Sequence, residues 1–179
     1  MNLLLHICCA NCAIYPVKML RQQHHLLTGY FFNHNIHPYQ EFRRRLDTTR
    51  EYAEQVDLPL IVSEEYALEE FLSNVAADPA SRCDYCYRAR MSATARLAAE
   101  QGFDGFSTSL LYSRYQQHDA IRAFGENLAA EYGLVFVYED YRVGWREGID
   151  VSKTMGLYRQ QYCGCIYSEK ERYYRPSTN

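Results

Sequence analysis

The chain has 179 residues, of which 47% are hydrophobic and 23% are charged, and its formal net charge is −3 at pH 7. This size and balance predict one globular domain over residues 1–179, and the weak negative charge excludes a general attraction to nucleic acid. No apolar stretch approaches the ~20 residues of a membrane span, and residues 1–6 lack the basic start and long apolar middle of a secretory signal. We therefore expect a cytoplasmic protein with no membrane partner.

Short apolar runs alternate with longer amphipathic stretches along the chain, a pattern typical of βαβ units. The apolar runs predict strands at residues 3–7, 27–32, 58–62, 103–111 and 134–138. The stretches between them predict helices that begin at about residue 16 and then cover residues 38–56, 66–72, 84–101 and 116–132. Five strands with intervening helices predict an α/β fold in which helices cover both faces of a parallel sheet.

Polar residues lie at or just after the carboxyl ends of four of the predicted strands. Cys8 and Cys9 follow the first strand, residues 33–35 the second and residues 139–140 the fifth, and the polar residues 107–109 lie in the last part of the fourth. Ligands of open parallel sheets bind at the carboxyl ends of the strands, near the point where the strand order reverses. We therefore expect these residues to face one rim of the sheet.

Seven cysteines fall into three tight clusters, which suit metal or redox chemistry better than structural disulfides in a reducing cytosol. The clusters are Cys8/Cys9/Cys12, Cys83/Cys86 and Cys163/Cys165. A structural zinc site or a four-iron cluster takes four cysteines, so three are left over. The surplus indicates a second task for the remaining thiols.

Each cluster allows more than one chemistry. Cys83 and Cys86 form a C-x-x-C at a predicted helix start, where both side chains share a face and the helix dipole favours thiolate. A disulfide between Cys163 and Cys165 would be strained and easily reduced, which describes a labile redox pair, but the pair can equally bind metal. Zinc, an iron–sulfur cluster and a dithiol redox centre all stay open at this point.

Five stretches of the chain carry a likeness to a known family. They are residues 5–12 (LHICCANC), 32–38 (FNHNIHP), 82–88 (RCDYCYR), 106–113 (FSTSLLYS) and 157–168 (LYRQQYCGCIYS). Together they resemble the cobalamin-independent epoxyqueuosine reductases, the QueH family. The resemblance implies a Rossmann-like fold and the last step of queuosine biosynthesis, the reduction of epoxyqueuosine to queuosine at the wobble position of tRNA. It also implies a low-potential electron donor such as ferredoxin or flavodoxin.

Carried over position by position, the resemblance implies a [4Fe-4S] cluster with an adjacent mononuclear iron. The implied cluster ligands are Cys8, Cys9, Cys83 and Cys86. Cys163 and Cys165 match a redox-active pair, and Cys12 stands where relatives carry Asp, so Cys12 is our candidate ligand of the second iron. We accordingly predict these three as catalytic residues and all seven cysteines as metal ligands.

The resemblance also frames the expected mechanism and substrate contacts. We expect the cluster to deliver electrons, the second iron to act as a Lewis acid on the epoxide oxygen, and Tyr162, His34 or Asp140 to protonate it. The predicted contacts to tRNA are Asn33, His34, Asn35, Arg82, Arg88, Ser109 and Arg159.

This chain departs from the family pattern in two places. Asn11 and Arg114 stand where the family often has Pro. We expect the first change to alter loop stiffness only, and the second to change local substrate contacts by removing a fixed backbone angle.

Two alternatives from other functional classes stay open. A zinc-stabilised RNA-binding module would be colourless and would show no redox behaviour. A dithiol oxidoreductase that uses Cys163 and Cys165 without a cluster would stay active after metal removal. A sulfur-transfer enzyme acting on tRNA would normally need ATP, and no glycine-rich phosphate loop is present.

Overall fold

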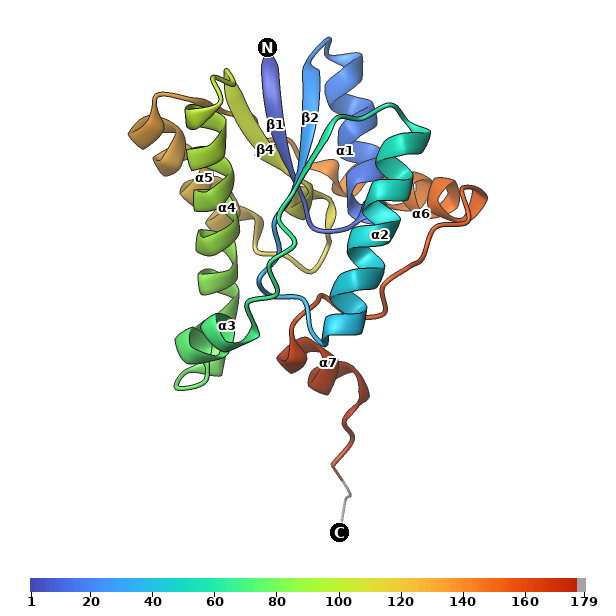
Figure 1. The fold of residues 1–179 in the computed structure, drawn as a ribbon, viewed down its shortest axis with the longest axis vertical. Helices are drawn as coiled ribbons and strands as arrows, with labels where there is room; N and C mark the ends of the chain where they lie inside the picture. The colour runs from blue at the N-terminus through green and yellow to red at the C-terminus, as the bar shows by residue number, and fades with distance from the viewer. Residues whose placement is uncertain (177–179) are drawn as a thin grey trace.

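A five-stranded parallel sheet forms the centre of the computed structural model, which describes residues 1–176 (Figure 1). The strands are β1 (Asn2–Ile7), β2 (Leu26–Phe31), β3 (Leu60–Val62), β4 (Gly105–Thr108) and β5 (Val135–Phe136). They lie in the order β3-β2-β1-β4-β5, and every neighbouring pair is parallel. The predicted α/β fold with a five-stranded parallel sheet is therefore confirmed.

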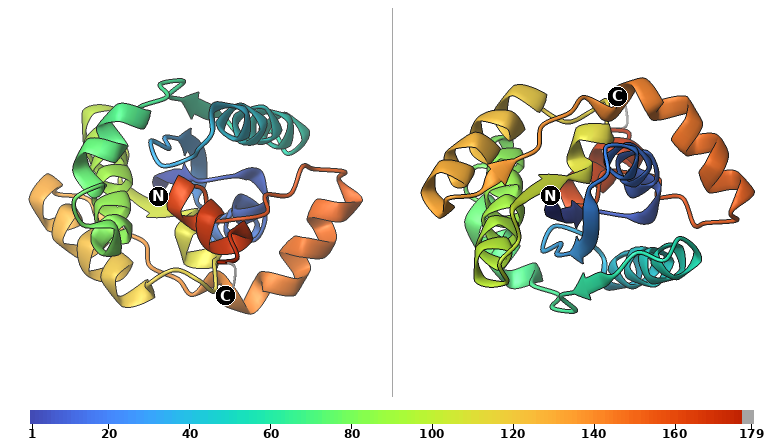
Figure 2. Two further views of the ribbon diagram at one scale, coloured as in Figure 1. Left: turned by 90° about the horizontal axis from the view of Figure 1, so that it is seen from below. Right: turned by 90° about the horizontal axis from the view of Figure 1, so that it is seen from above.

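Helices cover both faces of this sheet (Figures 1 and 2). One face carries α1 (Ala10–Gln22), α2 (Tyr39–Gln55) and α6 (Trp145–Thr154). The other carries α4 (Arg82–Glu100) and α5 (His118–Tyr132), and α3 (Leu68–Val75) packs against α4. The helices divide between the two faces because the chain first adds strands from β1 to β3 in one direction and then adds β4 and β5 in the other. Since the crossover connections keep the same handedness, reversing the direction puts the later helices on the opposite face.

The strand order reverses at β1, which lies between β2 and β4. The first turn of α4 and the short helix α7 (Ile166–Tyr173) both lie beyond the carboxyl edge of the sheet (Figure 1). Segments far apart in sequence therefore meet at the switch point, where ligands of doubly wound folds bind.

β1 is buried on both faces of the sheet. Leu3, Leu4, Leu5 and Ile7 have no exposed surface, and burying each such side chain contributes about 1.5–3 kcal/mol. His6 is equally buried, and its ring nitrogens contact Thr108 Oγ1 at 3.0 Å and the Phe32 carbonyl at 3.1 Å. The strand that leads into Cys8 is thus fixed by packing and by hydrogen bonds to its neighbours.

The first helix begins earlier than predicted. It starts at Ala10, directly after Cys9, so Pro16 lies inside it instead of at its start. Pro16 has no N–H to bond the Cys12 carbonyl, but the buried face formed by Ala13, Val17 and Leu20 holds the helix together. As a result, Cys12 lies on the first helical turn and not in a loop.

The fourth and fifth strands are shorter than predicted, and three later elements were not predicted. β4 ends at Thr108 because its hydroxyl accepts a hydrogen bond from Leu110 N and starts a 3₁₀ turn, Ser109–Tyr112. Beyond β5 lie the 3₁₀ turn Tyr141–Gly144 and the helices α6 and α7. None of the helices in the described part of the chain has the length and apolarity that a membrane span requires.

Candidate metal and redox site

Three cysteines gather where β1 passes into α1. Cys9 is the N-cap of α1 in an extended conformation, and Cys12 follows three residues later on the first turn, so the two side chains share a face. The sulfurs of Cys8, Cys9 and Cys12 all lie within 4.8 Å of one another. Cys9 and Cys12 are 2% and 9% exposed and Cys8 is half-buried, so solvent barely reaches two of the three donors.

The three neighbouring thiols differ in acidity. Hydrogen bonds from Cys12 and Cys9 hold the pKa of Cys8 well below its ordinary value. The same contact with Cys8 raises the pKa of Cys12 well above it. Ser109 supports Cys8, because its Oγ accepts from Cys8 N at 3.0 Å and lies 3.4 Å from Cys8 Sγ.

The second cluster lies on the first turn of α4, as predicted, and a buried cation faces it. Arg90 is 3% exposed, and its Nη2 lies 2.7 Å from Cys86 Sγ. Among the described residues, Arg90 has no carboxylate partner within ion-pair distance. Burial alone would lower the pKa of Arg90, but the charges of Cys86, Cys8 and Cys163 raise it. Thiols from all three clusters therefore act on one guanidinium.

The third cluster lies in an irregular segment that side chains of α2 hold in place. Arg45 is 2% exposed and donates to the carbonyls of Cys163 at 2.6 Å and Tyr162 at 2.9 Å. Its Nε also bonds Glu41 Oε1 at 2.7 Å. Cys163 is exposed, whereas Cys165 is buried.

The second and third clusters act on each other electrostatically. Burial raises the pKa of Cys86 to about 12, against the influence of Arg90, and charges on Cys163 and Cys165 raise it further. Among the described residues, Cys8, Cys9 and Cys12 form the only group of three or more cysteine, histidine or acidic side chains whose donor atoms all lie within 4.8 Å of one another.

A chain of hydrogen bonds connects α6 to the first cluster. Ser152 Oγ donates to Asn11 Oδ1, and Asn11 Nδ2 donates to Gln160 Oε1 at 2.7 Å. Gln160 Nε2 then donates to Cys9 Sγ at 2.9 Å and contacts Cys12 Sγ at 3.5 Å. We call Ser152, Asn11 and Gln160 the amide relay. The expectation that Asn11 affects only loop stiffness was wrong, because its side chain bonds groups of two distant segments.

Comparisons with known proteins identify the family of this chain. A family model described as Epoxyqueuosine reductase QueH matches residues 3–171. The chain belongs to the QueH family. It is 39% identical over 177 residues to an Epoxyqueuosine reductase QueH of Dehalococcoides mccartyi, covering 99% of this chain and 97% of that protein. It is 31% identical over 181 residues to the protein of that name from Thermotoga maritima, covering 96% and 92%.

Two of the predicted substrate contacts lie beneath the QueH cysteine site instead of at its surface. Asn33 is 1% exposed, and its Nδ2 donates to the Ile7 carbonyl at 2.9 Å. Ser109 has no exposed surface and contacts Cys8. These residues brace the strand end that carries the first cluster.

Asn35 and His34 lie on different sides of the same loop. Asn35 is buried beside Gly164, between the two last cysteines. His34 packs on the Phe32 ring, with centroids 4.2 Å apart, and its Nδ1 lies 3.6 Å from Glu70 of α3. It therefore faces α3.

The predicted arginine contacts lie farther out. Arg82 pairs with Glu171 of α7 at 2.5 Å, and the guanidinium of Arg88 lies 4.5 Å from the Phe124 ring centroid. Arg88 and Arg159 are exposed, which leaves their charged groups accessible to solvent.

The candidate acids are not equivalent. Hydrogen bonds from Arg142 lower the pKa of Asp140 to about 2, so Asp140 holds no proton at neutral pH and is excluded as the acid. Burial raises the pKa of Tyr162 to about 12, and its hydroxyl donates to the His37 carbonyl at 2.5 Å. Tyr162 therefore keeps its proton.

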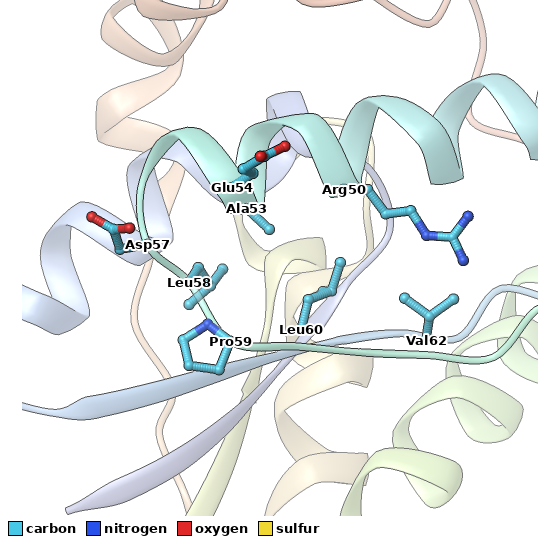
Figure 3. Close-up of a pocket in the computed structure, with 8 residues that line it drawn as sticks. All are labelled: Arg50, Ala53, Glu54, Asp57, Leu58, Pro59, Leu60 and Val62. Atoms are coloured by element: carbon cyan, nitrogen blue, oxygen red, sulfur yellow. The ribbon is translucent and has the colours of Figure 1, made fainter.

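A separate hollow of about 730 Å³ lies between the carboxyl end of α2 and β3 (Figure 3). Its described lining is Arg50, Ala53, Glu54, Asp57, Leu58, Pro59, Leu60 and Val62. This lining contains no thiol and none of the predicted site residues, so we assign it no part in the chemistry.

Proposed function

We propose that this protein reduces epoxyqueuosine to queuosine in tRNA. The family match over residues 3–171 supports the substrate and the reaction class. The observation that carries the proposal is the group formed by the buried Cys9 and Cys12 and the half-buried Cys8, whose sulfurs lie within 4.8 Å of one another. A third thiol in one such group is more than a dithiol exchange centre needs.

We further propose that the seven cysteines hold a [4Fe-4S] cluster and a second, mononuclear iron. Cys8, Cys9, Cys83 and Cys86 would hold the cluster, and Cys12 would hold the iron with Cys163 or Cys165. When bound, such a centre supplies electrons singly and a Lewis-acidic metal. The donor set fits it, because all seven thiols are free, the buried Arg90 guanidinium lies against Cys86 Sγ, and the Gln160 amide donates to Cys9 Sγ. Both compensate the negative charge of metal-bound thiolates.

The residues of the chain then have separate tasks in the reaction. Removal of the epoxide oxygen as water takes two electrons and two protons and leaves a carbon–carbon double bond. We assign the electrons to a low-potential donor such as ferredoxin or flavodoxin. Tyr162 holds a proton on its phenol beside the Cys163 segment, which makes it our candidate acid. Arg45 keeps that segment in place during turnover.

Exposed aromatic and basic groups next to Cys163 are suited to unpaired RNA bases. Gln116 Nε2 lies 3.3 Å from Cys163 Sγ, and the adjacent Tyr115 is 84% exposed. The Tyr115 ring and the Arg114 guanidinium lie 6.2 and 6.0 Å from the Trp145 ring centroid. Aromatic rings and Arg planes stack on splayed bases, and Arg159 and Arg88 can meet phosphates. We place this reaction in the cytoplasm, with the tRNA pool.

The test is anaerobic purification followed by iron and sulfide analysis, a visible spectrum, and incubation of the reduced protein with tRNA that contains epoxyqueuosine. We expect bound iron and sulfide and the formation of queuosine, and Cys83→Ser should abolish turnover. Tightly bound zinc in a colourless protein would favour the RNA-binding alternative. Full activity after metal removal would favour the dithiol alternative. Binding to tRNA should weaken steeply with added salt.

A further inference from the structure

The amide relay has a fixed direction. Asn11 Nδ2 donates to the Tyr158 carbonyl at 2.8 Å as well as to Gln160 Oε1. A backbone carbonyl only accepts, so the nitrogen of Asn11 must face that side, and its oxygen must face the Ser152 hydroxyl. Gln160 therefore presents its oxygen to Asn11 and has only N–H groups left for the sulfurs.

The relay ends on sulfurs that solvent barely reaches. Cys9 and Cys12 are 2% and 9% exposed, and Gln160 is itself half-buried. A hydrogen bond in such surroundings is screened less than one at the surface. N–H donors to cysteine sulfur draw charge away from a bound metal, and outer-shell partners of this kind orient the ligands and tune the reduction potential.

We propose that Asn11 is a positioning residue that locks the Gln160 amide with its N–H groups toward Cys9 and Cys12, and thereby raises the reduction potential of the metal centre. The effect on the potential rests on the proposed function, because it needs a metal on these cysteines. The orientation of the amide does not. Asn11 acts through Gln160 and does not itself contact a sulfur.

The first test measures the midpoint potential of the metal centre. It uses only substitutions that leave the net charge of the protein unchanged. Asn11→Leu removes the donor that holds Gln160, and Gln160→Met removes the donor to sulfur. Each substitution should lower the midpoint potential by about 59 mV, which corresponds to a tenfold change in the equilibrium constant of a one-electron reduction. The double variant should fall no further than the larger single shift, because the two residues act in one chain. Additive shifts, or a shift in Asn11→Leu alone, would overturn the proposal.

Gln161→Met is the matched control, because within residues 1–176 this neighbouring amide donates only to the Arg159 carbonyl, at 3.0 Å. Its potential should equal that of the unchanged protein, and a shift as large as that of Gln160→Met would also overturn the proposal. Asn11→Pro is a second variant that keeps the test valid if Asn11→Leu misfolds, since residue 11 lies on the first turn of α1, where Pro is tolerated. It should reproduce the Asn11→Leu shift.

The second test uses the metal-free protein. The side-chain amide protons of Gln160 are assigned by NMR from their loss in Gln160→Met, and their hydrogen exchange is measured. Asn11→Pro should speed this exchange about tenfold, because the amide is no longer held. If the exchange rate were the same in Asn11→Pro as in the unchanged protein, Asn11 would not hold the Gln160 amide and the proposal would be overturned. If the unchanged protein bound no redox-active metal, the proposed function would fail, and this measurement would still decide the orientation of Gln160.

Discussion

The first and third cysteine clusters are held by different means. Cys9 and Cys12 are placed by the backbone, because β1 is buried on both sides and α1 begins at once behind it. Cys163 and Cys165 lie in a segment without regular structure, which Arg45 holds through its carbonyls. Backbone placement gives fixed donors for a metal, whereas placement by a side chain leaves one thiol at the surface. Under the proposed function, the difference suits a resident centre in the first cluster and one substrate-facing thiol, Cys163, in the third.

Removing Arg45, which holds the segment of the third cluster, should have the largest effect on this contrast. Arg45→Met leaves Glu41, which is 7% exposed, without its cationic partner and frees two carbonyls. We expect a loss of about 3–5 kcal/mol in the free energy of unfolding, measured by urea titration. Arg43→Met is the control, because its pairs with Asp47 and Glu64 are more exposed and should contribute about 1 kcal/mol or less. Equal losses would mean that Arg45 anchors nothing.

Crowding the third cluster should have the next largest effect. A Cβ added at Gly164 would lie 3.2 Å from Asn35 Nδ2 and 3.2 Å from the Asn35 carbonyl. Overpacking of this kind typically costs about 1–3 kcal/mol, so Gly164→Ala should lower the urea midpoint. If the midpoint did not change, the segment would be loosely held and the contrast weaker than described.

Accessibility of the thiols tests the contrast directly. In the native metal-free protein, Cys163 should react with iodoacetamide about tenfold faster than Cys9 or Cys12, since reactivity follows exposure as well as thiolate content. Mass spectrometry of the digested protein measures each site. The three rates should converge in urea. Native rates that were already equal would contradict the difference in placement.

We expect the smallest effect from the ion pair between Asp140 and Arg142, which is exposed, whereas the pair between Glu41 and Arg45 is buried. Arg142 lowers the pKa of Asp140 from 3.8 to about 2, so the stabilisation from this charge is present above about pH 4 and is lost as pH falls toward 2. Asp140→Asn should lower the urea midpoint slightly at pH 6, and the difference should vanish on acidification. If the difference in urea midpoint grew toward pH 2, the pKa of Asp140 would not be lowered in the folded protein.

The sequence by itself determined the repetitive and local features of this protein. Alternating apolar and amphipathic stretches predicted the α/β fold, and the C-x-x-C spacing placed Cys83 and Cys86 on the first turn of a helix. Such patterns are readable because neighbours along the chain set the period of a strand or helix. The ends of elements were less predictable, as Pro16 shows, because burial of one face outweighed the missing hydrogen bond.

Only the tertiary structure decided which side chains support the sulfurs. Asn11 and Gln160 are 149 positions apart, and Arg45 and Cys163 are 118 apart. No periodicity connects residues at such separations, although Gln160 does lie in the distinctive stretch 157–168. These contacts exist because the parallel sheet brings its carboxyl ends to one edge, where β1, α4 and the last segment of the chain must satisfy each other's buried polar groups.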